Sequence, residues 1–74
     1  TLLVFVEVRF RTSNRYGSAA ATITRPKQTK IIKTATRYLI EQRLYNKVSA
    51  RFDVVAISHR NNEWQVEWIK NAFY

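Results

Sequence analysis

Seventy-four residues are enough for one small domain, and a chain of this length buries only roughly 60% of the surface that its unfolded state exposes. The absence of cysteine excludes a disulfide framework and a thiolate metal site, so packing or a partner chain has to supply the stability. Thirteen Lys and Arg against five Asp and Glu give a formal net charge of +8, which favours a polyanionic partner, nucleic acid above all.

The first segment, from Leu2 to Arg11, alternates in a way that predicts a β-strand. One face is wholly apolar, and it holds Leu2, Val4, Val6, Val8 and Phe10. The other face changes from apolar to charged, and it holds Leu3, Phe5, Glu7, Arg9 and Arg11. We therefore expect the second half of the strand to border a wet cleft.

The apolar start of the chain is not a targeting or membrane segment. Glu7 and Arg9 interrupt it and no basic segment precedes it, which excludes a signal peptide and a membrane helix. We expect a cytoplasmic protein without membrane contact. Because the sequence has no methionine and Thr1 already lies in a strand-like run, we also expect a chain trimmed at its N-terminus.

A helix follows the first strand after a loop over 12–17 and a small-residue stretch over 18–21. It is expected to begin around Thr24-Arg25-Pro26, since proline is tolerated in the first turn, and to run to about Leu44. Its apolar side gathers Ile31, Ile32, Ala35, Tyr38 and Leu39. Its basic side gathers Lys30, Lys33 and Arg37 within an arc of about 60°.

Two strands complete the order. A polar connection over 45–50 leads to a strand over 52–57, and a turn over 59–62 leads to a strand over 63–69. Asn61-Asn62 is suited to the positive φ of a tight hairpin. The result is an α/β chain of strand, helix, strand, strand, with the first two strands parallel, the last antiparallel, and too few elements to cover both faces of a mixed sheet.

Glu7 and Arg9 are the most informative pair in the sequence. Residues two apart on a strand point to the same side, where a carboxylate could hold a divalent cation and an arginine could stabilise a phosphoryl charge. Alternating charges on a solvated strand give the same pattern, so a plain surface ion pair is the competing interpretation.

A resemblance to a known family covers nearly the whole chain. The segment from Val4 to Arg11 is similar to the central strand of the bacterial YraN-like family of uncharacterised proteins. Further similar positions follow in the family's order and spacing: Tyr16-Gly17, Ala19 to Ala21, Thr24, Lys27-Gln28, Ala35, Leu39, Arg51 to Ala56 and Glu67 to Phe73. The resemblance implies that residues 1–74 form one incomplete domain, a partial restriction-endonuclease-like core similar to archaeal Holliday-junction resolvases.

The resemblance also implies a site. Glu7 would take the metal-binding acidic position and Arg9 the position written K in PD-(D/E)xK, with Mg²⁺ or Mn²⁺ as the cofactor of the complete domain. Arginine is effectively never deprotonated, so Arg9 would act only electrostatically. The family's second acidic ligand belongs to an upstream G-x-E-I-D-L-I segment that this sequence lacks, so we expect no tightly bound metal and no nuclease activity from this chain alone.

Two other residues are weighed as ligands and set aside. Asp53 is on a strand that could neighbour the first one, but we favour a carboxylate paired with an arginine or with backbone donors. His59 has no second histidine or cysteine near it.

We expect nucleic acid, and specifically DNA, to be contacted by Arg11, Arg15, Tyr16, Lys27, Lys30, Lys33 and Arg37. Tyr38 and Phe52 are assigned to the core, and Trp64 and Trp68 to a sheet cover or an oligomer contact. A non-catalytic nucleic-acid-binding module and a structural or protein-interaction domain remain alternatives. An incomplete sheet also predicts a homodimer through its exposed edge.

Overall fold

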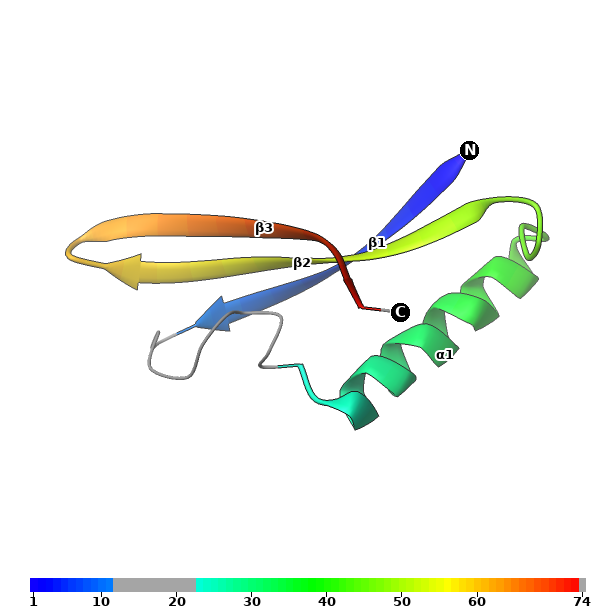
Figure 1. The fold of residues 1–74 in the computed structure, drawn as a ribbon, viewed down its shortest axis with the longest axis horizontal. Helices are drawn as coiled ribbons and strands as arrows, with labels where there is room; N and C mark the ends of the chain where they lie inside the picture. The colour runs from blue at the N-terminus through cyan, green and yellow to red at the C-terminus, as the bar shows by residue number, and fades with distance from the viewer. Residues whose placement is uncertain (12–22, 74) are drawn as a thin grey trace.

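The computed structural model describes residues 1–11 and 23–73 and contains three strands and one helix (Figure 1). The strands are β1 (Leu2–Arg11), β2 (Ser49–Arg60) and β3 (Glu63–Phe73), and the helix is α1 (Arg25–Glu41). The predicted order of strand, helix, strand, strand is confirmed. No helix of the described ranges is long and apolar enough to cross a membrane.

The strands form one mixed sheet in the order β1-β2-β3. β1 pairs with β2 in parallel along its whole length, from Leu2 beside Ser49 to Arg11 beside Ser58. β2 and β3 are antiparallel, as the two strands of a hairpin must be. The predicted sheet directions are therefore confirmed, with α1 as the crossover that a parallel pair needs.

Helix α1 begins where the sequence predicts and ends earlier. Thr24 is the N-cap, with its side chain accepting from the N–H of Lys27, and Pro26 lies in the first turn. The predicted end near Leu44 is wrong, because Arg43 adopts a φ of 58° that no α-helix continues through. The N–H of Leu44 then donates to the carbonyl of Leu39 at 2.8 Å and closes the helix end.

The β2–β3 hairpin turns at Asn61 and Asn62, whose φ values of 51° and 64° confirm the prediction of a tight turn with positive φ. Both strands are longer than predicted, since β2 begins at Ser49 and β3 continues to Phe73. Between Phe52 and Val54 the register with β3 shifts, and Asn71 opposite this point has a φ of 53°. A β-bulge therefore bends the last part of β3.

The core lies between α1 and one face of the sheet (Figure 1). Its buried members are Ile23, Ala35, Phe52, Val54, Ala56 and Phe73. Phe52 stacks on Phe5 of β1 and on Phe73 of β3, with ring centroids 5.5 and 5.3 Å apart, so one aromatic row links the three strands. The core assignment of Phe52 is confirmed. That of Tyr38 is wrong, because Tyr38 is 46% exposed and meets Phe5 only edge-on.

Candidate functional site

Glu7 lies on the face of β1 that is turned toward α1. Its Oε1 is 3.4 Å from the Nζ of Lys27 in the first turn of the helix. Both side chains are partly buried, Glu7 more than Lys27. The acidic position that the sequence singles out is therefore already neutralised by a cation of the same chain.

Arg9 follows two residues later on the same face, and its side chain is partly buried. In the sheet it lies beside Ala56, which in turn pairs with Glu67 of β3. Paired residues share a face, so Arg9 and Glu67 flank Ala56 on the side of the sheet that carries Glu7. The predicted common orientation of Glu7 and Arg9 is thus present.

An open groove of about 850 Å³ runs between β1 and α1. Leu3 to Glu7 line it from the strand, and Lys27 and Lys30 line it from the helix. Its walls elsewhere are mainly apolar and include Ile31, Tyr38, Phe52 and Phe73. One end of the groove is therefore charged, with two cations and one carboxylate. This groove borders Leu3 to Glu7, and the wet cleft expected beside the second half of β1 stays a prediction.

The residues in the described ranges do not fit a tightly held metal ion. No group of three or more His, Cys, Asp or Glu side chains comes together within residues 1–11 and 23–73. Magnesium in proteins is usually held by one or two carboxylates together with waters and substrate phosphates. Glu7 supplies one carboxylate, and Lys27 at 3.4 Å opposes a second cation there.

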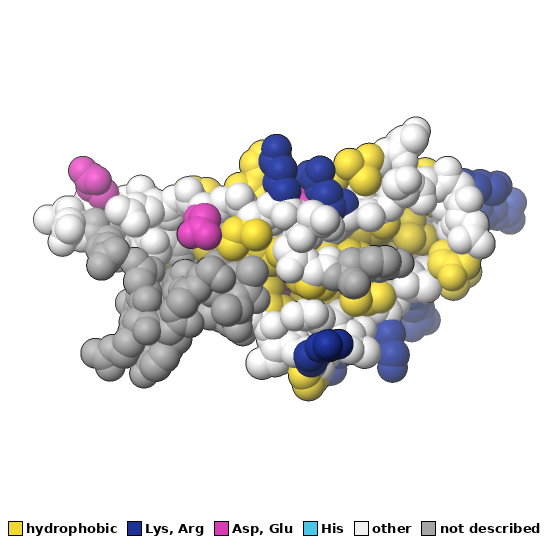
Figure 2. Space-filling view, in the orientation of Figure 1, with side chains coloured by type: hydrophobic (Ala, Val, Ile, Leu, Met, Phe, Trp, Pro, Cys, Tyr) yellow, Lys and Arg dark blue, Asp and Glu magenta, His cyan; other side chains and the backbone are white. Residues whose placement is uncertain are grey.

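The predicted basic contacts divide into two groups. Lys30, Lys33 and Arg37 are exposed on α1, where the Nε of Arg37 is 3.2 Å from the Oε1 of Glu41. Lys27 is partly buried beside Glu7, and it lines the groove together with Lys30. In Figure 2, Lys and Arg side chains lie around α1 and also over the strands at the top centre, whereas the two large acidic groups lie on the side of the β2–β3 turn. Arg15 and Tyr16 lie outside the described residues, and for Arg11 only the backbone in β1 is described.

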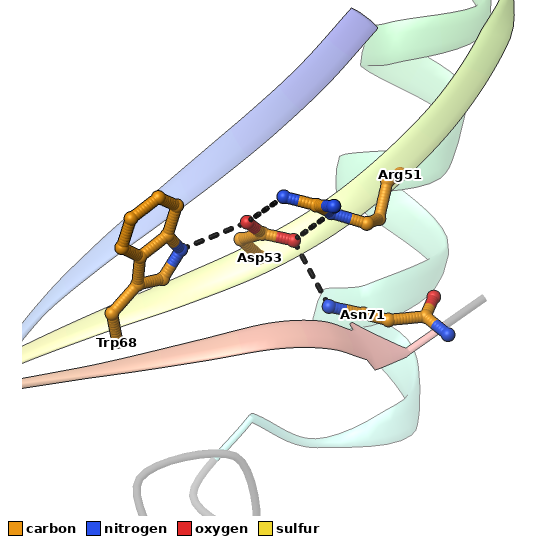
Figure 3. A network of polar contacts seen from close by, with 4 residues as sticks. All are labelled: Arg51, Asp53, Trp68 and Asn71. Carbon is orange, nitrogen blue, oxygen red and sulfur yellow. Dashed lines mark hydrogen bonds and ion pairs between the residues drawn. The ribbon is translucent and has the colours of Figure 1, made fainter. Parts of the chain in front are cut away.

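Asp53 lies on the opposite face of the sheet from Glu7, because Val54 is the residue of β2 that pairs with Glu7. Its carboxylate is fully buried and accepts four hydrogen bonds (Figure 3). Two come from Nε and a terminal nitrogen of Arg51 at 2.8 and 2.9 Å. The others come from the indole N–H of Trp68 at 2.8 Å and the backbone N–H of Asn71 at 2.9 Å.

These donors determine the charge state of Asp53. The hydrogen bonds from Arg51, followed by those from Asn71 and Trp68, hold the pKa of the Asp53 carboxyl well below its usual range, although burial acts in the opposite direction. The same contact raises the pKa of Arg51. The interpretation of Asp53 as a paired carboxylate is therefore confirmed, and Asp53 is not available to complete a metal site with Glu7.

Trp68 and Asn71 are the partners that the sequence did not indicate. Trp68 pairs with Val55 in the regular part of the hairpin, before the bulge begins, and only the place of Asn71 depends on the bulge. The one available signal was Asn71 itself, because asparagine tolerates positive φ better than most residues. His59, in the same hairpin, packs its ring 4.6 Å from that of Trp64.

Comparison with known proteins agrees with these residue patterns. Residues 1–57 match the model of a family described as "Uncharacterised protein family UPF0102". A UPF0102 protein of Saccharophagus degradans is 52% identical over 71 residues, which cover 96% of this chain and 57% of that protein. UPF0102 proteins of Nitrosomonas europaea and Legionella pneumophila are 51% and 45% identical, each over 96% of this chain and 58% of their own length.

The chain thus spans little more than half the length of these relatives. No solved structure matches it. The family match covers most of the chain, and the relatives share about half of its residues. The chain therefore belongs to the UPF0102 family, which is the YraN-like family of bacterial proteins.

Proposed function

We propose that this chain is a nucleic-acid-binding domain, with DNA as its ligand, and that the longer proteins of its family hydrolyse phosphodiesters with Mg²⁺ or Mn²⁺. The observation that carries the binding proposal is the charge of α1. Its cations are Arg25, Lys27, Lys30, Lys33 and Arg37, and its single acidic residue, Glu41, is at its end. Such a surface attracts phosphate along residues 25–37, a length of about three turns.

Helix stability does not explain these cations. The positive end of the helix dipole is at the N-terminus, where acidic side chains are stabilising and basic ones are not. The first turn of α1 has no acidic residue and carries Arg25 and Lys27, and its last turn has no basic residue. The charges oppose the dipole at both ends. Lys27 and Arg37 have partners within the fold, in Glu7 and Glu41, so a polyanionic ligand is the better reason chiefly for Arg25, Lys30 and Lys33.

The residues of this chain support binding more directly than cleavage. Arg9 could hold a phosphate oxygen through its guanidinium, but it could not act as a base. Glu7 would have to leave Lys27 before it could bind a metal ion. We therefore expect the 74-residue chain to bind nucleic acid without cleaving it.

Binding is tested by fluorescence anisotropy with a labelled DNA duplex over a range of salt concentrations. Each phosphate contact should contribute about 0.9 to the slope of log K against log salt. The variant Lys30→Gln/Lys33→Gln removes two exposed cations of α1, and we expect weaker binding and a smaller slope. The matched control Arg43→Gln/Lys47→Gln removes two exposed cations beyond the helix end and should leave both unchanged. An affinity that is insensitive to salt would overturn the proposal.

Cleavage is tested separately on plasmid and branched DNA. The chain itself should give no product with Mg²⁺ or Mn²⁺, whereas the full-length Saccharophagus degradans relative should give metal-dependent cleavage. If the 74-residue chain cleaved DNA and Glu7→Gln abolished that cleavage, the expectation that the chain alone is inactive would be contradicted. Salt-sensitive binding without cleavage by the full-length relative would favour a non-catalytic module, and neither activity would favour a structural or protein-interaction domain.

A further inference from the structure

The sheet has a second face, away from α1, that no described element covers. The large apolar side chains of this face that are most exposed come from the two outer strands, and each is between 48% and 67% exposed. They are Leu2, Val6, Val8 and Phe10 of β1 and Trp64, Val66 and Trp68 of β3. The register places Val55 and Ile57 of β2 between them. Contiguous apolar surface of this kind marks an interaction site.

We propose that this face is the interface of a homodimer in which two copies of the chain pack sheet against sheet. The inference is independent of the proposed nucleic-acid binding. The seven side chains together expose on the order of 800 Å² of apolar surface, which is about what each partner buries in a stable interface of standard size. A twofold pair would place the same patch on both sides, as an isologous dimer requires.

The charge distribution permits this pairing despite the net charge of +8. The cations of α1 lie on the other side of the sheet, so in the dimer the two helices would face outward. Packed sheets are about 10 Å apart, and each helix adds about as much again, so the two basic surfaces would lie well beyond the Debye length of about 8 Å at physiological salt. Repulsion between them would be largely screened.

Two cations of the described residues near this face already have partners within the chain. Arg51 is bound to Asp53, and the Nζ of Lys70 lies 4.8 Å from the centre of the Trp68 ring. Leu2, Val6 and Val8 offer nothing to a phosphate or to a base, although Phe10, Trp64 and Trp68 could stack on bases. An apolar partner surface could pack against all seven side chains, whereas a nucleic acid could stack only on the three aromatic ones.

The two tryptophans make the proposal directly measurable, because Trp64 and Trp68 are the only tryptophans of the chain and both lie on this face. On one dilution series, light scattering measures the mass of the particle, and acrylamide quenching of intrinsic fluorescence measures how exposed the two tryptophans are. We expect a dimer at high concentration that dissociates on dilution. Quenching should rise in step with dissociation.

Two variants of β3 test whether the dimer forms through the apolar face or through the surface next to it. Val66→Lys places a charge on the apolar face, and we expect it to raise the dimer Kd by about tenfold or more. Gln65→Lys adds the same charge one residue earlier in β3, where the side chain points to the opposite face of the sheet. It should therefore change the dimer Kd less than about twofold. Val8→Thr, which keeps a β-branched shape, provides a second and milder change from β1 should Val66→Lys fold poorly by circular dichroism.

Three results would overturn the proposal. If the chain were a monomer at every concentration, the face would be covered by something other than a second copy, such as the additional residues that the longer relatives have. A dimer whose tryptophans remain open to acrylamide would place the contact away from this face, for example at an exposed edge of the sheet, as the sequence predicts. A monomer whose tryptophans become protected only when single-stranded DNA is added would make the face a base-stacking surface.

Discussion

Asp53 illustrates at the scale of one residue how pairing determines the role of a carboxylate. From sequence it could be either a metal ligand or a paired acid, and the alternation of β2 decides between them by placing it on the face opposite Glu7. Its donors then hold it ionised while fully buried. An arginine two residues away is visible in the sequence, whereas the contribution of Trp68 depends on the register of the hairpin and that of Asn71 on the bulge in β3.

The lowered pKa of Asp53 predicts acid sensitivity. A carboxyl whose pKa is lower in the folded than in the unfolded chain contributes stability that is present above its unfolded pKa and is lost as the pH falls. The melting temperature should therefore fall as the pH drops below about 4, the ordinary pKa of aspartate. Thermal melts followed by circular dichroism between pH 7 and pH 2 measure this.

The variant Asp53→Asn assigns the effect to this residue. Its amide group would turn a donor toward the donors of Arg51, Trp68 and Asn71, so we expect a lower melting temperature at pH 7. The difference from the parent chain should narrow in acid, where the parent loses the contribution of Asp53. Glu63→Gln removes an exposed carboxylate and serves as the control. A difference that stays constant down to pH 2 would contradict the assignment.

At the scale of elements, the sequence predicts the existence and type of each element better than its ends. The start of α1 is recognisable from Thr24 and Pro26. Its end is not, because a left-handed residue at a helix end is usually glycine and here it is Arg43. β2 begins three residues before its predicted start, at Ser49, since the polar residues there pair with β1 rather than form a loop.

Arg43→Gly tests the helix end. A non-glycine residue in the left-handed region costs roughly 1–2 kcal/mol, which glycine avoids. We expect the variant to raise the free energy of unfolding by about 1 kcal/mol in urea denaturation. Arg43→Ala removes the same side chain but keeps the unfavourable φ, so it should give no such gain. Equal effects of the two variants would show that the side chain, not the backbone, matters.

The aromatic row that joins the strands gives a second prediction for the elements. Phe52 is 2% exposed and lies between Phe5 and Phe73, so Phe52→Ala should lower the free energy of unfolding by about 3–5 kcal/mol. Tyr45→Ala, at a half-exposed aromatic in the α1–β2 connection, should change it by less than about 0.5 kcal/mol. Similar losses from both would mean that the row does not hold the sheet together.

At the scale of the whole molecule, the parallel and antiparallel pairings follow from the sequence, whereas the choice of sheet face does not. β1 has apolar residues on both faces, and α1 packs on the face that also carries Glu7 and Arg9. Pattern alone favours the wholly apolar face for the core, and that face is the open one. The radius of gyration is 14.1 Å, against about 11 Å for a compact domain of this length, as expected for one helix on one side of a long sheet.

Association would make the stability of the molecule depend on concentration. If the open face is covered by a second copy, the melting temperature should rise with protein concentration, because the dimer is favoured by mass action. Differential scanning fluorimetry across a wide concentration range measures this, with Val66→Lys as the comparison. A melting temperature independent of concentration in both proteins would indicate a monomer that unfolds alone.

The polar network of Asp53 also bears on how the molecule opens. All of its members belong to β2 and β3, which are joined by a short turn, whereas β1 is joined to β2 only through residues 12–48, which include α1. Closing a longer connection costs more entropy. We therefore expect the hairpin to keep the hydrogen bonds of Asp53 if β1 and α1 detach. Its amides should be the slowest to exchange with solvent deuterium, and those of β1 should exchange first, so the strand that carries Glu7 and Arg9 is the part of the sheet most readily released.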